Sequence, residues 1–181
     1  MSPPVVVLLR HGEKPDPKAG IQGVDERGRA LPEGLSPPGW QRAGALVRLL
    51  VPLAPDAAWL PRPTALWAAR ATGRHPSRRP LLTLLPLAAE LRLAVDQSAS
   101  ADDPPESVAA RLASLSGVTV VCWRHDDLPA LARALCPQAD VPPLWPEDRF
   151  DVLWVVEGEG DGRHFRALPQ RLLAGDGATP F

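Results

Sequence analysis

Two arginine–histidine pairs in this sequence each follow directly on an apolar run. Arg10 and His11 come after VVVLL, and Arg124 and His125 come after VTVVCW. Guanidinium groups bind the oxygens of a phosphoryl group through paired hydrogen bonds, and a neutral imidazole can attack its phosphorus atom. The two pairs therefore predict a pocket for phosphoryl chemistry, although each histidine alone also fits a loop residue that bonds to the backbone.

A third cationic segment, RHPSRRP over 74–80, contains Arg78 and Arg79. We expect both arginines in the first turn of a helix, where a cation opposes the helix dipole and costs roughly 0.3–1 kcal/mol. An anion bound at this helix start would offset that cost. The alternative is a solvated basic patch with no ligand.

Apolar runs predict the strands that position these groups. Continuous apolar residues over 4–9 and 118–123 are typical of strands covered on both faces. A short strand is predicted over 64–69, and FDVLWVVEGEGDGRHFRAL, 150–168, predicts a hairpin across a glycine-rich turn. The segment 12–35 has no periodicity, so we expect a long loop there, and long loops in compact domains are often functional.

Helical patterns separate the predicted strands. Over 35–50, Ser36 is expected to cap an amphipathic helix whose first residue is a proline. Ser77 is expected to cap the next helix, which Pro86 should kink or split. Two more helices are predicted, over 105–115 and 128–135.

The alternation of strands and helices predicts an α/β fold. We expect a three-layer sandwich, with a mostly parallel central sheet and helices on both faces. The length fits a single domain over 1–181. In sheets of this kind, ligands bind beyond the carboxyl ends of the strands. His11 and His125 both follow such ends, so we expect them to share one site.

Four segments, in order along the chain, resemble the motifs of one family. They are LLRHGE at 8–13, LSPPGWQRA at 35–43, SRRPLLT at 77–83 and VVCWRHDDLPALARAL at 120–135. The second is similar to L-[ST]-x-x-G-x-x-[QR]-A and the third to S-x-x-R-A-x-Q-T. By these motifs the chain resembles the histidine phosphatase superfamily, which includes the cofactor-dependent phosphoglycerate mutases. The resemblance runs the length of the chain and implies a phosphoglycerate mutase-like fold.

The resemblance also implies roles for single residues. His11 would be the nucleophile that becomes phosphorylated. Arg10, Arg79 and His125 would surround the transferring phosphoryl group. Arg79 lies four residues before the threonine of its motif, which selects it as the family arginine. Arg78 would take this phosphate-binding place if the helix began in another register.

Three hypotheses concern the proton donor to the leaving group. Asp126 follows the second histidine directly, as the acid of the acid phosphatase members does, although it could instead cap the helix over 128–135. Glu90 is nearest in position to the mid-chain glutamate of the mutase-like members, although its neighbours LAAELRL are typical of a helix end. The short phosphohistidine phosphatases of the family need no strong acid, because their leaving group is already good.

We therefore expect a metal-independent phosphatase that uses no cofactor and forms a phosphohistidine on His11. Its substrate is expected to be a small phosphoester or a phosphoprotein, and a mutase is less favoured because no long insertion closes the site against water. Leu82 replaces the family glutamine and Arg124 replaces a glycine. These departures favour a second hypothesis, a non-catalytic phosphate-binding or interaction module that retains the fold.

Composition argues against several other classes of partner. The chain has 20 Lys and Arg against 21 Asp and Glu, a formal net charge of −1, which does not favour nucleic acid or an anionic membrane. No apolar run approaches the roughly 18 residues of a membrane-spanning helix. Cys122 and Cys136 lack the spacing of a metal site, so we expect no metal and a reduced, cytoplasmic protein. No feature indicates the oligomeric state.

Overall fold

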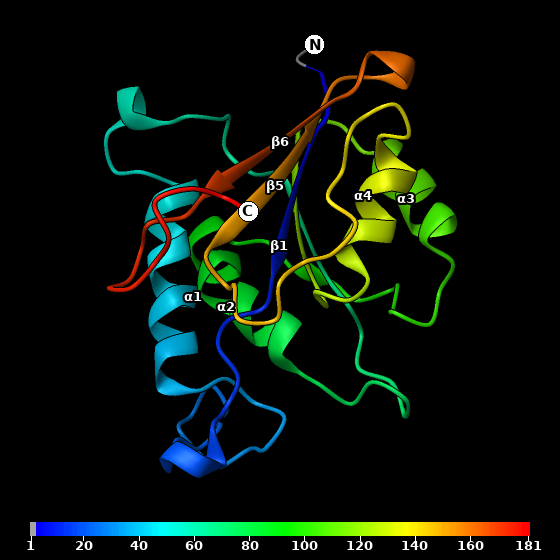
Figure 1. Ribbon diagram of the computed structural model, residues 1–181. Coiled ribbons are helices and arrows are strands. Elements are labelled where there is room, and N and C mark those ends of the chain that lie inside the picture. Colours follow the sequence, from blue (N-terminus) through cyan, green and yellow to red (C-terminus); the bar gives the residue numbers. More distant parts are fainter. Residues whose placement is uncertain (1–2) are drawn as a thin grey trace.

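Six strands form a single mixed sheet in the computed structural model, which describes residues 3–181 (Figure 1). The strands are β1 (Val5–Arg10), β2 (Ala65–Ala68), β3 (Val95–Asp96), β4 (Val118–Trp123), β5 (Val152–Glu157) and β6 (His164–Pro169). Their order across the sheet is β3-β2-β4-β1-β5-β6. β1 to β4 run parallel, β5 is antiparallel to β1, and β5 and β6 form the predicted hairpin. The prediction of a mostly parallel sheet is confirmed.

Two α-helices of the described chain cover each face of this sheet (Figure 1). They are α1 (Pro37–Leu50) and α2 (Arg79–Leu91) on one face, and α3 (Pro105–Ala113) and α4 (Leu128–Leu135) on the other. Successive side chains of a strand point to opposite faces. Val7 of β1 therefore packs in the core beneath α1 and α2, and Leu8 packs in the core beneath α3 and α4. The predicted three-layer sandwich is confirmed.

The first turns of α1 and α2 differ. In α1, Ser36 is the predicted cap, and its Oγ accepts a 3.2 Å hydrogen bond from the Gly39 N–H. α2 begins at Arg79 with Arg78 in the cap position, and no side chain caps it. The prediction that Ser77 caps this helix is wrong, because its hydroxyl accepts only a 3.4 Å bond from the first helical N–H.

Pro86 lies inside α2, which continues unbroken to Leu91. The expected split does not occur, because Leu84 and Leu87 on either side of the proline are buried in one core and hold both halves of the helix on the sheet. One continuous helix therefore has Arg79 as its first residue and the candidate acid Glu90 near its end.

The segment 12–35 forms the predicted long loop, with one short 3₁₀-helix at Pro17–Ala19. Its course beyond β1 depends on glycine. A Cβ atom on Gly12 would lie 2.8 Å from the carbonyl oxygen of Gly39 in α1, closer than real Cβ atoms approach. Only glycine therefore lets the chain after His11 pass this close to the start of α1. Two more 3₁₀-helices are at Pro55–Ala57 and Gly160–Gly162.

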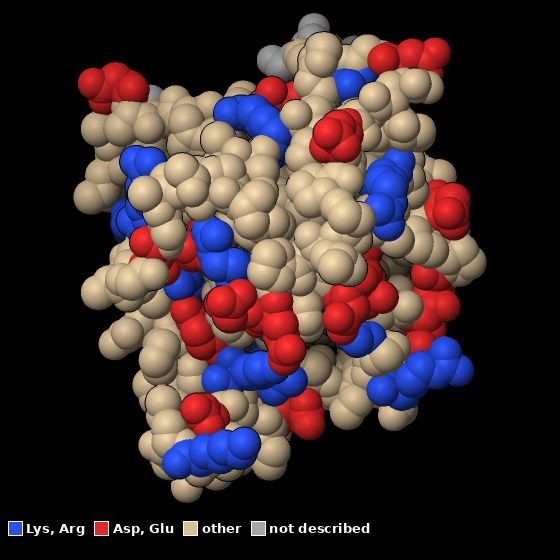
Figure 2. All heavy atoms as spheres, viewed as in Figure 1, with Lys and Arg blue, Asp and Glu red and all other residues tan. Residues whose placement is uncertain are grey.

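Charged side chains of both signs gather toward the end of the sheet where β1 terminates, in the lower half of the view in Figure 2. Among residues 3–181, no helix is long and apolar enough to cross a membrane. The same residues include no group of three or more His, Cys, Asp or Glu side chains that could hold a metal ion.

Candidate active site

His11 lies one residue beyond β1 and is 6% exposed. Its Nδ1 is 2.7 Å from the carbonyl oxygen of Gly12, an acceptor, so Nδ1 carries the hydrogen and Nε2 keeps its lone pair. Burial is the main cause that lowers the pKa of this imidazole to about 3, and the nearby basic side chains Arg79, Arg10 and His125 lower it further. The ring is therefore neutral near pH 7, with Nε2 available as a nucleophile.

Arg10 ends β1 and is 1% exposed. Its Cζ lies 3.8 Å from the centroid of the Phe150 ring. Its Nη1 donates to the backbone carbonyls of Glu147 and Arg149. Nε is buried without a hydrogen-bond partner among the described residues. Burial lowers the pKa of this guanidinium to about 10, so it remains a cation at neutral pH.

Arg79 is the first residue of α2, and its side chain is 16% exposed. The loop over 12–35 holds it: Nη2 lies 3.5 Å from a carboxylate oxygen of Glu33, and Nη1 donates to the Pro32 carbonyl at 3.4 Å. Within the part of the chain that the structure describes, its buried Nε has no partner. Desolvation lowers the pKa of Arg79. Among neighbouring charges, that of Arg79 acts most strongly on the His11 ring.

His125 follows β4, which pairs with β1 in parallel register. Its side chain is 19% exposed, and its Nε2 lies 3.3 Å from the Asp126 carboxylate. Burial and then the charge of Arg10 lower the pKa of His125. Asp126 is 57% exposed and accepts a 2.8 Å bond from Nη2 of Arg124. It lies at the rim of the site and does not cap α4, whose cap position is Asp127.

The structure thus brings Arg10, His11, Arg79 and His125 together and leaves two other predicted residues outside this group. Arg78 is exposed and lines a separate hollow. Glu90 pairs with Arg48 of α1 at 3.1 Å. Glu90 is also three helical turns beyond Arg79, about 16 Å at 1.5 Å per residue. The geometry therefore does not bring the Glu90 carboxyl near the nucleophile.

The two departures from the family motifs have structural explanations. Leu82 is fully buried in a small core with Leu35 and Ala43, so it fills space between α1 and α2. Arg124 turns its guanidinium toward the neighbouring loop, where Nη1 lies 2.8 Å from Nε2 of His75. Arg124 also binds Asp126 at the rim of the site, through Nη2.

Thr83 is a site residue to which the sequence motifs gave no role beyond marking the position of Arg79. Its buried hydroxyl accepts a 2.8 Å bond from the Gly12 N–H and donates a 2.8 Å bond to the Arg79 carbonyl. This bridge sets the distance between the His11 loop and the first turn of α2. Thr83 comes four residues after Arg79, so the two lie on one side of the helix, and this spacing could have identified Thr83 as a site residue.

The segment after α4 supplies a second set of unpredicted contacts. Phe150 packs on Arg10, and its ring centroid is 6.2 Å from that of His11. Lys14 pairs with Glu147 at 2.9 Å and so links the loop over 12–35 to this segment. The charges of both groups act on His125. No periodic pattern in the sequence marks these contacts.

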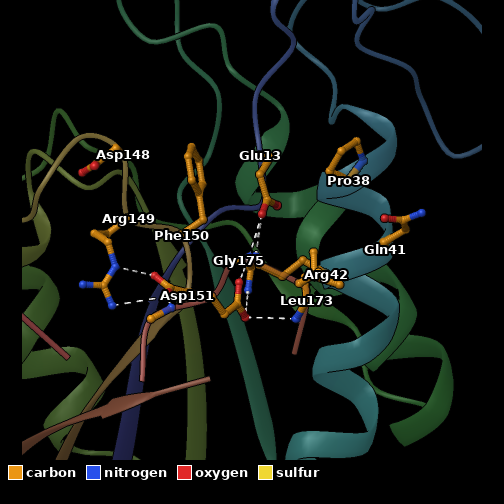
Figure 3. Close-up of a pocket in the computed structure, with 13 residues that line it drawn as sticks. Glu13, Pro38, Gln41, Arg42, Asp148, Arg149, Phe150, Asp151, Leu173 and Gly175 are labelled. Carbon is orange, nitrogen blue, oxygen red and sulfur yellow. Dashed lines mark hydrogen bonds and ion pairs between the residues drawn. The ribbon is translucent and has the colours of Figure 1, made fainter. Parts of the chain in front are cut away.

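A buried ion-pair network holds the start of the loop over 12–35 (Figure 3). Arg42 of α1 is 3% exposed and binds Glu13 and Asp176, each at 2.7 Å, and its Nη1 donates to Gln170. Burial alone would raise the pKa of Asp176, but hydrogen bonds from Arg42 and the backbone lower it to about 2. The network borders a hollow of about 730 Å³. Phe150 lines this hollow and also packs against Arg10. It ties the loop beyond His11 to the C-terminal segment.

No protein-family model matches the chain, and no curated protein matches it. Solved structures do. The protein histidine phosphatase SixA, complexed with tungstate, is 17% identical with a TM-score of 0.57, over 92% of this chain and 97% of that one. Bacillus stearothermophilus YhfR is 16% identical with a TM-score of 0.53, over 89% and 94%. An Escherichia coli K-12 protein assigned as an alpha-ribazole-5'-P phosphatase is 14% identical with a TM-score of 0.59, over 94% and 98%.

At these identities the likeness is one of fold, and it extends over nearly the whole of each chain. The architecture is the one that the sequence motifs implied. The chain therefore has the fold of the histidine phosphatase superfamily.

Proposed function

We propose that this chain is a phosphatase that hydrolyses phosphoric monoesters through a phosphohistidine on His11. One observation carries the proposal: a neutral histidine with a free Nε2 lies among cationic side chains. In the described part of the chain, two guanidinium Nε–H groups of this cluster, on Arg10 and Arg79, are buried without a partner. Buried donors without partners are costly, and an anion's oxygens would satisfy them.

In the first step, Nε2 of His11 attacks phosphorus, and the bond from phosphorus to the ester oxygen breaks with its electron pair on that oxygen. The guanidinium groups of Arg10 and Arg79 neutralise the phosphoryl oxygens, and the His125 ring donates a hydrogen bond to one of them. The hydrogen bond from Nδ1 to the Gly12 carbonyl stabilises the positive ring that forms.

In the second step, a water molecule attacks the phosphorus of the phosphohistidine and gives a proton to the Asp126 carboxylate, which gave up its own proton in the first step. The N–P bond breaks, its electron pair returns to Nε2, and inorganic phosphate leaves. We propose Asp126 as the group that protonates the leaving oxygen in the first step, because its carboxyl group lies at the rim of the site, 3.3 Å from Nε2 of His125. Glu90 is not retained for this role, because it is paired at the far end of α2.

The solved structures with the same fold suggest two classes of substrate. One solved neighbour is a protein histidine phosphatase and another is assigned to a small phosphoester. We propose the same two classes for this chain, a phosphoprotein or a small phosphorylated molecule. The tungstate in the SixA structure is an oxyanion, which supports an anion-binding role for the shared fold.

Hydrolysis of p-nitrophenyl phosphate, with and without a chelator, tests the proposal. Turnover that survives chelation supports a metal-independent phosphatase. If no phosphoester in a panel is hydrolysed, and phosphohistidine is not hydrolysed either, the result would instead support a non-catalytic phosphate-binding module. Leu82 no longer favours that alternative, because it fills a small core between α1 and α2. Arg124 binds the proposed acid Asp126 and remains the departure that favours it.

A further inference from the structure

A second basic hollow lies beside the candidate site and is not used by the mechanism above. Its volume is about 310 Å³. Its polar lining consists of two guanidinium groups, a hydroxyl and an amide, from Arg70, Arg78, Ser77 and Gln97, and the remaining lining residues are Ala69, Ala71 and Leu81. No carboxylate is among these lining residues, so the hollow presents positive charge and hydrogen-bond donors.

The hollow lies at the same edge of the sheet as His11. Arg70 comes two residues after β2, which is parallel to β4 and, through it, to β1. Two strand spacings separate the carboxyl ends of β2 and β1, which is about 10 Å. Arg78 immediately precedes Arg79 of the phosphate-binding group, and its N–H is bonded to the Glu33 carbonyl.

The arginines of this segment differ in their partners. Arg74 pairs with Asp102, and Arg79 pairs with Glu33. None of the ion pairs between residues 3–181 uses Arg70 or Arg78.

The carboxylate that Arg70 does influence is already satisfied. The backbone N–H and the hydroxyl of Ser100 bind Asp103, and they lower the pKa of Asp103 more than the charge of Arg70 does.

The position of Arg78 at the start of α2 is a second reason to expect an anion. Its charge sits at the cap position of α2, where it opposes the helix dipole, and no side chain caps the helix. The adjacent Arg79 differs, because the Glu33 carboxylate offsets its charge. An anion in the hollow would offset the charge that Arg78 places at this helix start.

We propose that this hollow binds a second anionic group of the substrate, a phosphate or a carboxylate, about 10 Å from the phosphoryl group that His11 attacks. This proposal rests on the proposed phosphatase function and names its substrate class: phosphoesters that carry a further negative charge. A phosphorylated molecule without such a group would bind only through the reacting phosphate.

The test compares hexyl phosphate with hexanediol bisphosphate, whose extended chain separates its two phosphates by roughly the required distance. Wild-type protein should prefer the bisphosphate in kcat/KM by about tenfold, beyond the statistical factor for its two ends. Arg70→Gln and Arg78→Gln should each remove most of this preference. Arg133→Gln, which removes an exposed arginine of α4, is the matched control and should keep it.

Two further arms define the ligand. The phosphate ester of a hydroxy acid of the same length replaces the second phosphate by a carboxylate, and a preference retained with this ester extends the subsite to carboxylates. Propanediol bisphosphate is too short to reach the hollow, so it should show no preference. An equal preference for the short compound, or one that survives in both glutamine variants, would overturn the proposal.

Equilibrium binding separates this proposal from the proposed catalysis. Calorimetry with the His11→Ala variant needs no turnover, and the bisphosphate should bind about tenfold more tightly than hexyl phosphate. Loss of that difference on adding Arg70→Gln supports the hollow even if no substrate is hydrolysed. Equal affinity for both compounds, in a protein whose wild type hydrolyses hexyl phosphate, would reject the hollow and leave the phosphatase function standing.

Discussion

The two halves of the candidate site differ in how firmly they are held. On one half, Arg10 and His11 are 1% and 6% exposed, and backbone carbonyls bind both side chains. On the other half, the side chains of His125 and Asp126 are 19% and 57% exposed, and their polar contacts are to other side chains. The first half belongs to the core of the protein and the second to its surface.

This difference corresponds to two tasks in phosphoryl transfer. A nucleophile and the cations around its target must keep one geometry, which burial and backbone contacts provide. A proton donor must regain its proton from the attacking water in the second step, so it needs access to solvent. We therefore expect substitutions in the buried half to affect every substrate, and substitutions at the rim to affect substrates according to their leaving group.

His11→Ala should give the largest effect. It removes the atom that bonds to phosphorus, so activity should fall by at least about 10⁴-fold for all substrates. The fold should survive, because His11 lies beyond the end of β1, and circular dichroism checks this. His164→Ala, at an exposed site on β6, controls for the loss of an imidazole.

Rapid quenching of the wild type at alkaline pH, where phosphohistidine is stable, should trap phosphate on His11. Activity in the alanine variant close to that of the wild type would exclude the proposed intermediate.

Arg79→Ala should give the next largest effect. It removes a buried cation beside His11 and a donor to the phosphoryl oxygens, so kcat/KM should fall by about 10³-fold for good and poor leaving groups alike. Arg78→Ala changes the adjacent arginine outside this group and should cost far less with a monophosphate. The reverse order of the two losses would show that Arg78 occupies the family position.

The buried half of the site was largely predictable from the sequence, because local patterns determine it. The apolar run of β1 places Arg10 and His11 at a strand end, and β4 does the same for His125. The structure starts α2 at Arg79, two residues after the predicted cap, Ser77. At this start, Glu33 of the loop over 12–35 binds the Arg78 N–H and the Arg79 guanidinium, and no local pattern predicts these contacts.

The remaining site residues depend on contacts between segments that are distant in the sequence. Thr83 bonds to Gly12, and Phe150 packs on Arg10. Neither contact follows from periodicity or residue type. Glu90 was a candidate only by its position along the chain, and the unbroken course of α2 carries it away from the site.

Asp126→Asn tests the rim. An alkyl phosphate needs a proton as its P–O bond breaks, and a positioned acid typically gives 10²–10⁴-fold; at this exposed site we expect about 10². A p-nitrophenolate leaving group needs little help, so its hydrolysis should change far less. The measurement is the ratio of the two kcat/KM values in the variant against the wild type. An unchanged ratio would remove Asp126 from the mechanism and favour a substrate whose leaving group needs no acid, such as phosphohistidine.

The last prediction concerns stability rather than rate, and it tests the burial of His11 directly. Its pKa is about 3 in the folded protein and 6.5 as the ordinary value. Between these values the unfolded chain binds a proton at this site and the folded chain does not. The free energy of unfolding should therefore increase with pH in this window, by as much as about 1.4 kcal/mol per unit, and become independent of His11 above it.

Urea unfolding of the wild type and His11→Ala, in buffer free of phosphate, isolates this contribution, because other titrating groups are common to both proteins. The wild type should lose stability more steeply than the variant as the pH falls from about 6.5 toward about 4. Phosphate must be absent, because a bound anion would favour the protonated ring and reduce the difference. Equal slopes would mean that His11 is as accessible to protons as the rim is. In that case the contrast between a buried nucleophile and an exposed rim would not hold in solution.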